Sequence, residues 1–316
     1  MKNFIIKFIR KLKLEFFVVG IYFNFIRKVG ANNIEFDIKE FKNINFRKGN
    51  IKKYEEIPKI IWMFWSEPCI PHDIEICISR IKSLNPNYEI NILNKYTIKK
   101  FIIIDLDNEN MPLANISDLI RLRLLNQYGG VWLDASIIMN KPIDWFINKE
   151  GNIFDLIAFY REVTTVNDTY PVLESWFLIA PKESRYIKKW LKVFEPVEVI
   201  GSSCYFQKIK NRIDYLEIKQ KISPPDYLIV YLANQITMKE IKNCNLSLYL
   251  SDKSAYLLQD TLGWRAYKTH AYLALLDAPN SVSPIYKLTS GDRKYMNIIF
   301  NKKIINPKSI LGVIEN

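Results

Sequence analysis

Three charged residues between positions 118 and 134 suit chemistry on a phosphorylated ligand. Asp118 and Arg121 are three positions apart, so on a helix they share one face and can address one ligand together. A carboxylate suits ribose hydroxyls or a base edge, whereas a guanidinium binds a phosphate through two parallel hydrogen bonds. Asp134 can ligate a hard divalent cation, which offsets the charge of a pyrophosphate and improves the leaving group. Together, the three side chains suit a binding site for a nucleoside diphosphate.

Each of these residues taken alone has a plainer interpretation. A carboxylate and a guanidinium three residues apart commonly form a surface ion pair. A single Asp after a strand is usually a turn residue. The hypothesis of a ligand site therefore depends on whether the fold brings the three side chains together.

The first elements of the core alternate between strand and helix. Pro58 precedes a continuous apolar run over 59–65, which predicts a strand buried on both faces. The apolar spacing over 73–84 predicts a helix, and 88–93 predicts a second strand. This order is typical of parallel strands in an α/β fold.

A longer helix is predicted over 116–127, with Asn115 or Ser117 as its cap. Gly129 and Gly130 end it and allow a sharp turn into a short strand over 131–133. Asp134 follows that strand directly. Residues 31–56 are polar and are predicted to be a connecting stretch. Further elements are predicted as strands over 153–159 and 175–180 and a helix over 183–194.

Ligands of open α/β sheets bind where parallel strands end, at their carboxyl edge. Trp65 ends the first predicted strand of the core, and Asp134 ends the strand over 131–133. The helix that carries Asp118 and Arg121 leads into the second of these strands. We therefore expect all four residues at one edge of the sheet.

The order of these residues resembles a known family. The segment Ser117–Ser136 resembles the donor-site segment of glycosyltransferases with the GT-A fold and a sugar-binding DxD region, and 57–65 is similar to their first strand. The closest resemblance is to the capsular polysaccharide synthesis protein family, a relative of the family 32 glycosyltransferases. It extends over about residues 57–290 and includes the segments Glu174–Phe177, Asp226–Tyr227 and Pro284–Thr289.

This resemblance implies a GT-A, Rossmann-like nucleotide-diphospho-sugar transferase fold, with a mixed, mostly parallel sheet and a helical N-terminal extension. It divides the chain into a basic amphipathic extension, 1–56, and a GT-A domain, 57–316. It implies a nucleotide-sugar-dependent hexosyltransferase of the retaining type, acting in bacterial capsular or other surface polysaccharide synthesis. In the donor site, Trp65 would stack on the base, and Asp118 and Arg121 would hold ribose and phosphate.

The resemblance places Asp134 at the first Asp of the DxD, as a catalytic and metal-binding residue. Ser136 stands at the third position of the donor site, where the wider superfamily has a second Asp. One carboxylate binds Mg²⁺ or Mn²⁺ weakly unless phosphates and another residue complete its coordination. We therefore expect a weakly held divalent cation, bound mainly through the donor.

Three residues are candidates on the acceptor side. Glu174 is a candidate base for the attacking hydroxyl, or a stabiliser of a positively charged sugar transition state; a strand-end acid bound to water is the alternative. Trp176 suits a platform for the sugar, with a core position as the alternative. Asp226 is a candidate for holding an acceptor hydroxyl.

The basic charge of the chain is concentrated at its start. Residues 1–30 contain seven basic side chains and one acidic one, which is half of the net charge of +12. The apolar stretch from 16 to 26 is shorter than the roughly twenty residues that span a bilayer. A basic, aromatic-rich helix suits an anionic membrane surface, and a helix packed on the domain is the alternative. Four cysteines without a CxxC pair indicate a reduced, cytoplasmic protein.

Three hypotheses follow. The first is an enzyme that transfers sugar from a nucleotide-sugar onto a lipid-linked glycan, peripherally bound at the inner face of the cell membrane. The second is a non-catalytic assembly partner in polysaccharide synthesis with a degenerate donor site, suggested by Ser136. The third, a nucleic-acid binder, is disfavoured because the charge is concentrated before residue 30 and no recognisable binding motif is present.

Overall fold

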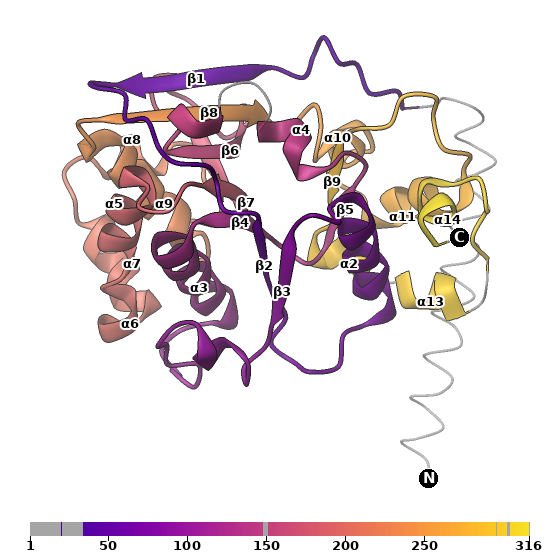
Figure 1. The fold of residues 1–316 in the computed structure, drawn as a ribbon, viewed down its shortest axis with the longest axis horizontal. Coiled ribbons are helices and arrows are strands. Elements are labelled where there is room, and N and C mark those ends of the chain that lie inside the picture. Colours follow the sequence, from indigo (N-terminus) through magenta and orange to yellow (C-terminus); the bar gives the residue numbers. More distant parts are fainter. Residues whose placement is uncertain (1–19, 21–33, 148–150, 295, 302–303, 316) are drawn as a thin grey trace.

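The computed structural model describes residues 20, 34–147, 151–294, 296–301 and 304–315. Its centre is a seven-stranded mixed sheet with the strand order β1-β8-β6-β7-β4-β2-β3 (Figure 1). Five of the seven strands run in one direction, and β7 and β1 run in the other. The strands are β1 (Asn43–Lys48), β2 (Ile60–Phe64), β3 (Glu89–Leu93), β4 (Gly130–Leu133), β6 (Leu156–Arg161), β7 (Val172–Ala180) and β8 (Cys244–Leu250).

The predicted strand–helix–strand unit at the start of the core is confirmed. Helix α2 (His72–Leu84) connects β2 to β3, and β2 pairs in parallel with both β3 and β4. Successive side chains of a strand point to opposite faces, so Trp62 packs into one core and Ile61 and Met63 into the other. Because both faces of β2 are covered, its sequence is a continuous apolar run.

Helices cover both faces of the sheet (Figure 1). Helices α3 (Leu113–Tyr128), α5 (Arg185–Phe194) and α9 (Ile229–Glu240) pack in the first core, and α2 and α4 (Ile143–Ile147) pack in the second. The short helices α6 (Val197–Ile200), α7 (Ser202–Lys210) and α8 (Tyr215–Lys219) follow α5. This arrangement confirms the predicted mixed, mostly parallel α/β class.

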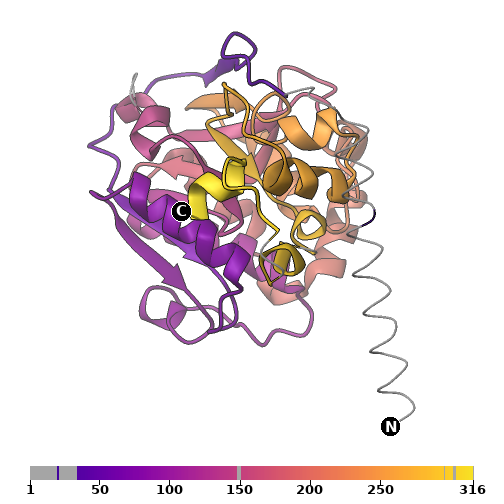
Figure 2. The same cartoon turned by 90° about the vertical axis from the view of Figure 1, so that its right-hand side faces the viewer.

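The C-terminal segment adds a third core next to α2. A two-stranded antiparallel sheet joins β5 (Ile137–Met139) to β9 (Ile285–Lys287). Figure 2 shows the C-terminal helices in front of this region, and two of them, α13 and α14, contact α2. The helices of this segment are α10 (Leu257–Thr261), α11 (Ala266–Leu275), α12 (Ser290–Arg293), α13 (Met296–Asn301) and α14 (Ile310–Glu315).

Two local expectations are wrong. Strand β1 lies within 31–56 and pairs with β8 along the sheet edge, so this stretch is not merely a connection. Helix α3 begins at Leu113 after Pro112, earlier than predicted. Asn115 does not cap it, because its side chain accepts a hydrogen bond from Ser202 Oγ at 2.9 Å and donates to Asp118.

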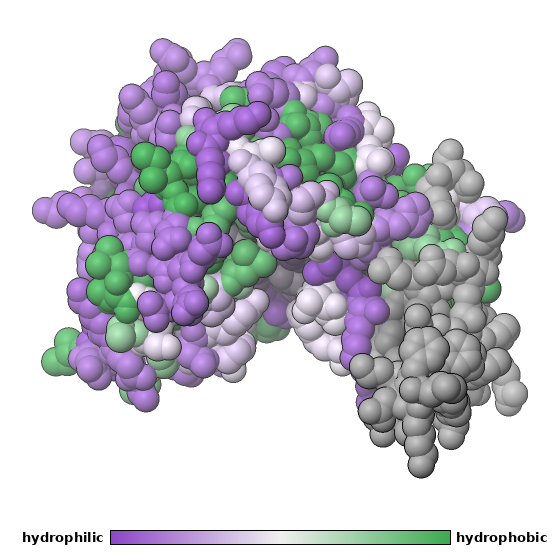
Figure 3. Space-filling model, turned by 90° about the horizontal axis from the view of Figure 1, so that it is seen from below, coloured by the Kyte–Doolittle hydropathy of each residue, from purple (hydrophilic) through white to green (hydrophobic). Residues whose placement is uncertain are grey.

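The predicted basic helix over 1–28 lies, except for Gly20, outside the described residues. Among the helices that the structure does describe, none is both long and apolar enough to cross a bilayer. On the face seen in Figure 3, hydrophobic residues form several separate groups among hydrophilic ones. The described residues visible there therefore form no single broad apolar surface.

Replacing Ser184 by Ala lowers the free energy of unfolding by about 1–2 kcal/mol. Ser184 is fully buried and caps α5, because its Oγ accepts a hydrogen bond from the Ile187 backbone N–H and donates to Asp155 O. Urea denaturation measures the difference. Ser83→Ala is the control, since Ser83 is exposed and donates only to Arg80 O in its own helix. Equal stability of the two variants would contradict the capping role.

Candidate functional site

A cavity of about 460 Å³ opens at the carboxyl ends of β2 and β4. Both strands run in the same direction, so the residues that follow them meet at one edge of the sheet. Six of the predicted site residues line this cavity, from segments that are distant in the sequence: Trp65, Asp118, Arg121, Asp134, Ser136 and Trp176.

Helix α3 presents the predicted pair, Asp118 and Arg121, to the cavity. A nitrogen of the Arg121 guanidinium lies 2.8 Å from Asp118 Oδ1. The guanidinium also donates to Ser175 Oγ and, at 3.3 Å, to Asp134 Oδ1. It lies over the Trp132 ring, with its central carbon 5.1 Å from the ring centre. Arg121 therefore connects α3 to β7 and to the residue that follows β4, and its orientation is fixed by these contacts.

Asp134 accepts hydrogen bonds on both carboxylate oxygens. Oδ1 accepts from Arg121 and from Trp132 Nε1 at 3.1 Å, and Oδ2 accepts from Lys287 Nζ at 2.8 Å. Burial by itself would raise the pKa of Asp134, but the charges of Lys287 and Arg121 outweigh it and lower that pKa. Asp134 is therefore ionised at neutral pH and anchors two cations.

Lys287 is a site residue that the sequence analysis did not single out. Its Nζ donates to Asp134 Oδ2 and, at 2.9 Å, to Ser136 Oγ. The segment Pro284–Thr289 carries part of the family resemblance, and that was the available signal. Its proximity to Asp134 arises from the pairing of β9 with β5, which follows the Asp134–Ser136 triplet.

The cavity has an aromatic wall and a surplus of positive charge. The Arg293 guanidinium lies over the Trp65 ring, 5.3 Å from the ring centre. Tyr227, Tyr231 and Tyr256 add to the lining. Three basic side chains and two acidic ones line the cavity, so its formal charge is 3 − 2 = +1. The site thus suits an anion joined to a flat ring.

Glu174 does not itself line the cavity but lies behind two residues that do, Trp176 and Tyr231. It is 5% exposed, and its Oε2 accepts hydrogen bonds from Trp176 Nε1 and Tyr231 Oη, each at 2.8 Å. Burial raises the pKa of Glu174. Its role as base or stabiliser stays a prediction. In this arrangement Glu174 would influence a ligand in the cavity through its hydrogen bonds to Trp176 and Tyr231, which do line the cavity.

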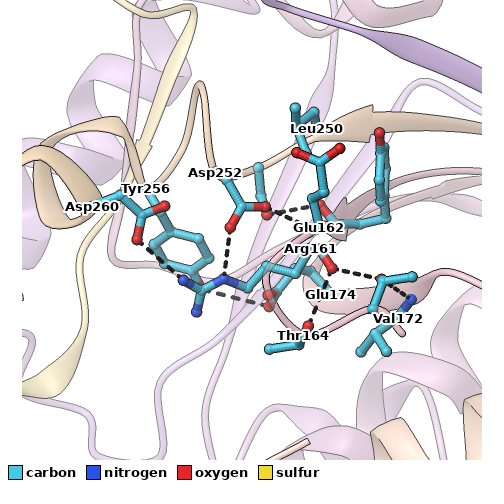
Figure 4. Close-up of polar contacts among 12 residues, drawn as sticks. Arg161, Glu162, Thr164, Val172, Glu174, Leu250, Asp252, Tyr256 and Asp260 are labelled. Carbon is cyan, nitrogen blue, oxygen red and sulfur yellow. Dashed lines mark hydrogen bonds and ion pairs between the residues drawn. The ribbon is translucent and has the colours of Figure 1, made fainter. Parts of the chain in front are cut away.

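An arginine network lies beside Glu174 (Figure 4). The Arg161 guanidinium pairs with Asp252 at 3.4 Å and Asp260 at 3.2 Å. It lies near the rings of both Tyr256 and Trp264, 4.8 and 4.6 Å from their centres. Tyr256 thus both lines the cavity and contacts this cation.

Two predicted acceptor residues lie in different places. Trp176 lines the first cavity although only 2% of its surface is exposed. Asp226 does not line that cavity; it lines a neighbouring one of about 810 Å³. Tyr227 lines both cavities. An acceptor role for Asp226 therefore stays a prediction, and it would require the acceptor to extend past Tyr227.

The expected divalent cation can be compared with the available oxygen ligands. Mg²⁺ takes six oxygen ligands at close range, but both oxygens of Asp134 and the hydroxyl of Ser136 already accept hydrogen bonds from nitrogen donors. The described residues contain no group of three or more His, Cys, Asp or Glu that could hold a metal ion. This arrangement does not fit a cation held by the protein at Asp134.

Between about pH 5 and pH 7.5, we expect the wild type to lose about 1 kcal/mol of stability relative to Asp118→Asn. Burial raises the pKa of Asp118 to about 6, against the charge of Arg121. The folded protein therefore keeps a proton that the unfolded chain has released. The resulting stabilisation is complete below about pH 4 and is lost as pH rises through about 6. Urea denaturation of both proteins across this range tests it, and a constant difference would contradict it.

Several known proteins are similar to this chain. Over 161 residues it is 24% identical to "O-glycosyltransferase braB" of Annulohypoxylon truncatum, covering 43% of this chain and 37% of that protein. Over 164 residues it is 24% identical to "Glycosyltransferase afumC" of Aspergillus fumigatus, covering 46% and 41%. The chain thus spans less than half the length of these curated relatives.

A solved structure and a family also match. The structure named "PaToxG Glycosyltransferase" aligns over 96% of this chain and 97% of its own, with 16% identity and a TM-score of 0.34. The sequence model described as "Capsular polysaccharide synthesis protein" matches residues 22–302, which is most of the chain. The chain therefore belongs to the capsular polysaccharide synthesis protein family.

Proposed function

We propose that this protein is a glycosyltransferase that transfers a sugar from a nucleotide-sugar to a hydroxyl of a capsular or other surface polysaccharide. The observation that carries the proposal is the single cavity in which Trp65, Arg121 and Lys287 lie around Asp134. The aromatic ring suits a base, and the two cations suit a diphosphate. Membership of the family and the names of the relatives support this assignment.

The reaction breaks the bond between the sugar C1 and the oxygen of the β-phosphate. The electron pair stays on that oxygen, so the nucleoside diphosphate leaves with one more negative charge. The acceptor hydroxyl oxygen forms the new bond to C1 and releases its proton to a base. Preorganised cations next to the diphosphate stabilise the developing charge, and Arg121 and Lys287 are held in orientation by Asp134.

A lipid-linked acceptor, a hexosyl donor, retention of configuration and contact with the inner face of the membrane belong to the same proposal. They come from the family resemblance and from the basic segment before residue 30. A chain that binds its donor in a polar cavity and contacts a lipid surface through a basic segment suits this role.

A donor screen tests the proposed function. The full-length protein is incubated with a panel of nucleotide-sugars, with and without a lipid-linked glycan fraction, and the released nucleoside diphosphate is recorded. Release from one donor, with growth of the glycan, is expected. Nucleotide binding without release under any condition would instead favour the non-catalytic assembly partner.

Trp65→Ala weakens the binding of the donor's nucleoside diphosphate about tenfold or more, because base–aromatic stacking contributes roughly 1–3 kcal/mol. Isothermal titration calorimetry measures the change, and Trp65→Phe should retain most of the affinity. Inorganic pyrophosphate, which has no base, is the matched ligand and should bind the wild type and Trp65→Ala equally. An equal loss for both ligands would show that Trp65 does not contact the base.

A further inference from the structure

Lys287 contacts the two side chains at the ends of the Asp134–Ser136 triplet. Its Nζ is 2.8 Å from Asp134 Oδ2 and 2.9 Å from Ser136 Oγ. These are the first and third positions of the DxD-like motif, so the ammonium group takes the place next to the motif that a bound cation would need. Only 11% of the Lys287 side chain is exposed, so its charge is poorly screened by water.

The backbone of Lys287 is fixed from three sides. Its N–H donates to Ala255 O at 2.9 Å, and its carbonyl accepts from Gln259 Nε2 at 2.7 Å. It is also the register partner of Ile137 in the β5–β9 pair. The next residue, Leu288, donates its N–H to the Ser136 carbonyl at 3.0 Å. Lys287 is thus held against the triplet by main-chain contacts, unlike a mobile surface lysine.

The geometry leaves donors for an anionic ligand. An ammonium has three hydrogens, and the contacts to Asp134 and Ser136 use two of them. Among the described contacts, the Nε atoms of Arg121 and Arg293 are buried and have no hydrogen-bond partner. Three cationic side chains, Arg121, Lys287 and Arg293, therefore line one cavity, and guanidinium and ammonium groups bind phosphate oxygens well.

We propose that the Lys287 ammonium does the work of the divalent cation expected at the DxD-like motif. It hydrogen-bonds the donor diphosphate and, together with Arg121 and Arg293, offsets the charge that develops as the bond from C1 to the β-phosphate oxygen breaks. Donor binding and sugar transfer then require no metal ion. This inference rests on the proposed function and identifies its charge-neutralising residue.

The first test uses the wild-type protein and measures binding. Pyrophosphate and a panel of nucleoside diphosphates are titrated by calorimetry in EDTA and then in excess Mn²⁺ or Mg²⁺. We expect affinities that differ by less than about twofold between the two conditions. A rise of tenfold or more on adding metal would overturn the inference, because the cation would then contribute what we assign to Lys287.

The second test replaces the lysine. Lys287→Met removes the charge with little change in length, and we expect it to lower pyrophosphate affinity and transfer by about a hundredfold, as for the loss of one preorganised donor. Lys287→Arg keeps the charge and should retain most of the binding. Lys141→Met is the control, since Lys141 is exposed and does not line the cavity. Unchanged pyrophosphate binding by folded Lys287→Met would overturn the inference.

Two results separate this inference from the proposed function. If a donor is consumed only with added metal and EDTA stops the reaction, the result supports the proposed transferase activity but contradicts the role of Lys287. If the wild type consumes no donor under any condition, the result contradicts the proposed transferase activity. Metal-free pyrophosphate binding that is lost in Lys287→Met would still support Lys287 as a diphosphate-binding residue. The wild-type titration needs no variant, so it decides the question even if Lys287→Met does not fold.

Discussion

Asp134→Asn lowers the rate of sugar transfer by about a hundredfold or more, which is the usual cost of losing a preorganised charge arrangement. The carboxylate of Asp134 binds Arg121 with one oxygen and Lys287 with the other. An amide has one oxygen and one NH₂ group, so it presents N–H donors to one of these cations. That cation then turns away from the position in which it meets the diphosphate.

The same substitution leaves the fold intact. Arg121 keeps its contacts with Asp118 and Ser175, and Lys287 keeps Ser136, so neither cation is left without a partner. The melting curve should therefore stay close to that of the wild type, and so should the far-UV circular dichroism spectrum. If Asp134 served only as a structural ion-pair partner, its replacement would instead cause a large loss of stability with a small effect on transfer.

Asp214→Asn is the matched control for this experiment. Asp214 also pairs with an arginine and a lysine, Arg212 at 2.9 Å and Lys239 at 3.1 Å, but it does not line the cavity. Its loss should leave transfer unchanged. If Asp134→Asn also retained full activity with a normal melting curve, Asp134 would have no catalytic role.

The local sequence predicted the part of the site that lies on neighbouring elements. Asp118 and Arg121 are one helical turn apart, and Asp134 follows the next strand. The unit of β2, α2 and β3 was predicted from apolar runs and Pro positions, because strands buried on both faces and an amphipathic helix leave clear patterns. Trp65 and Asp134 meet because β2 and β4 are parallel and adjacent.

The rest of the site depends on contacts between distant segments. Lys287 reaches Asp134 through the β5–β9 pair, 153 residues away in the sequence, and no local pattern specifies that pairing. Tyr231 belongs to α9 and hydrogen-bonds Glu174. The burial of Glu174 therefore could not be predicted from the sequence of its own strand. The start of α3 was missed for the same reason, since Asn115 bonds to Ser202 of α7 and does not act as a cap.

Gly130→Ala lowers the free energy of unfolding by roughly 2 to 5 kcal/mol. Gly130 begins β4 with φ of +92°, a conformation that L-residues with a side chain rarely adopt. A Cβ there would lie 2.5 Å from the carbonyl oxygen of Ile60, on the strand that pairs with β4. The strand must therefore move away from β2, and Asp134 at its end moves with it. Chemical denaturation measures the stability loss, and the donor assay should show a parallel loss of transfer.

Gly263→Ala separates the two causes of that loss. Gly263 also has a positive φ, +69°, but a Cβ at this position would meet no atom within 4 Å. Its replacement should cost only the backbone strain, about 1–2 kcal/mol, and should leave transfer unchanged. If the two variants lost equal stability, the close approach of β4 to Ile60 would not be the reason for a glycine at position 130. A larger loss in Gly130→Ala, accompanied by loss of transfer, would show that this approach positions Asp134 for the cations it holds.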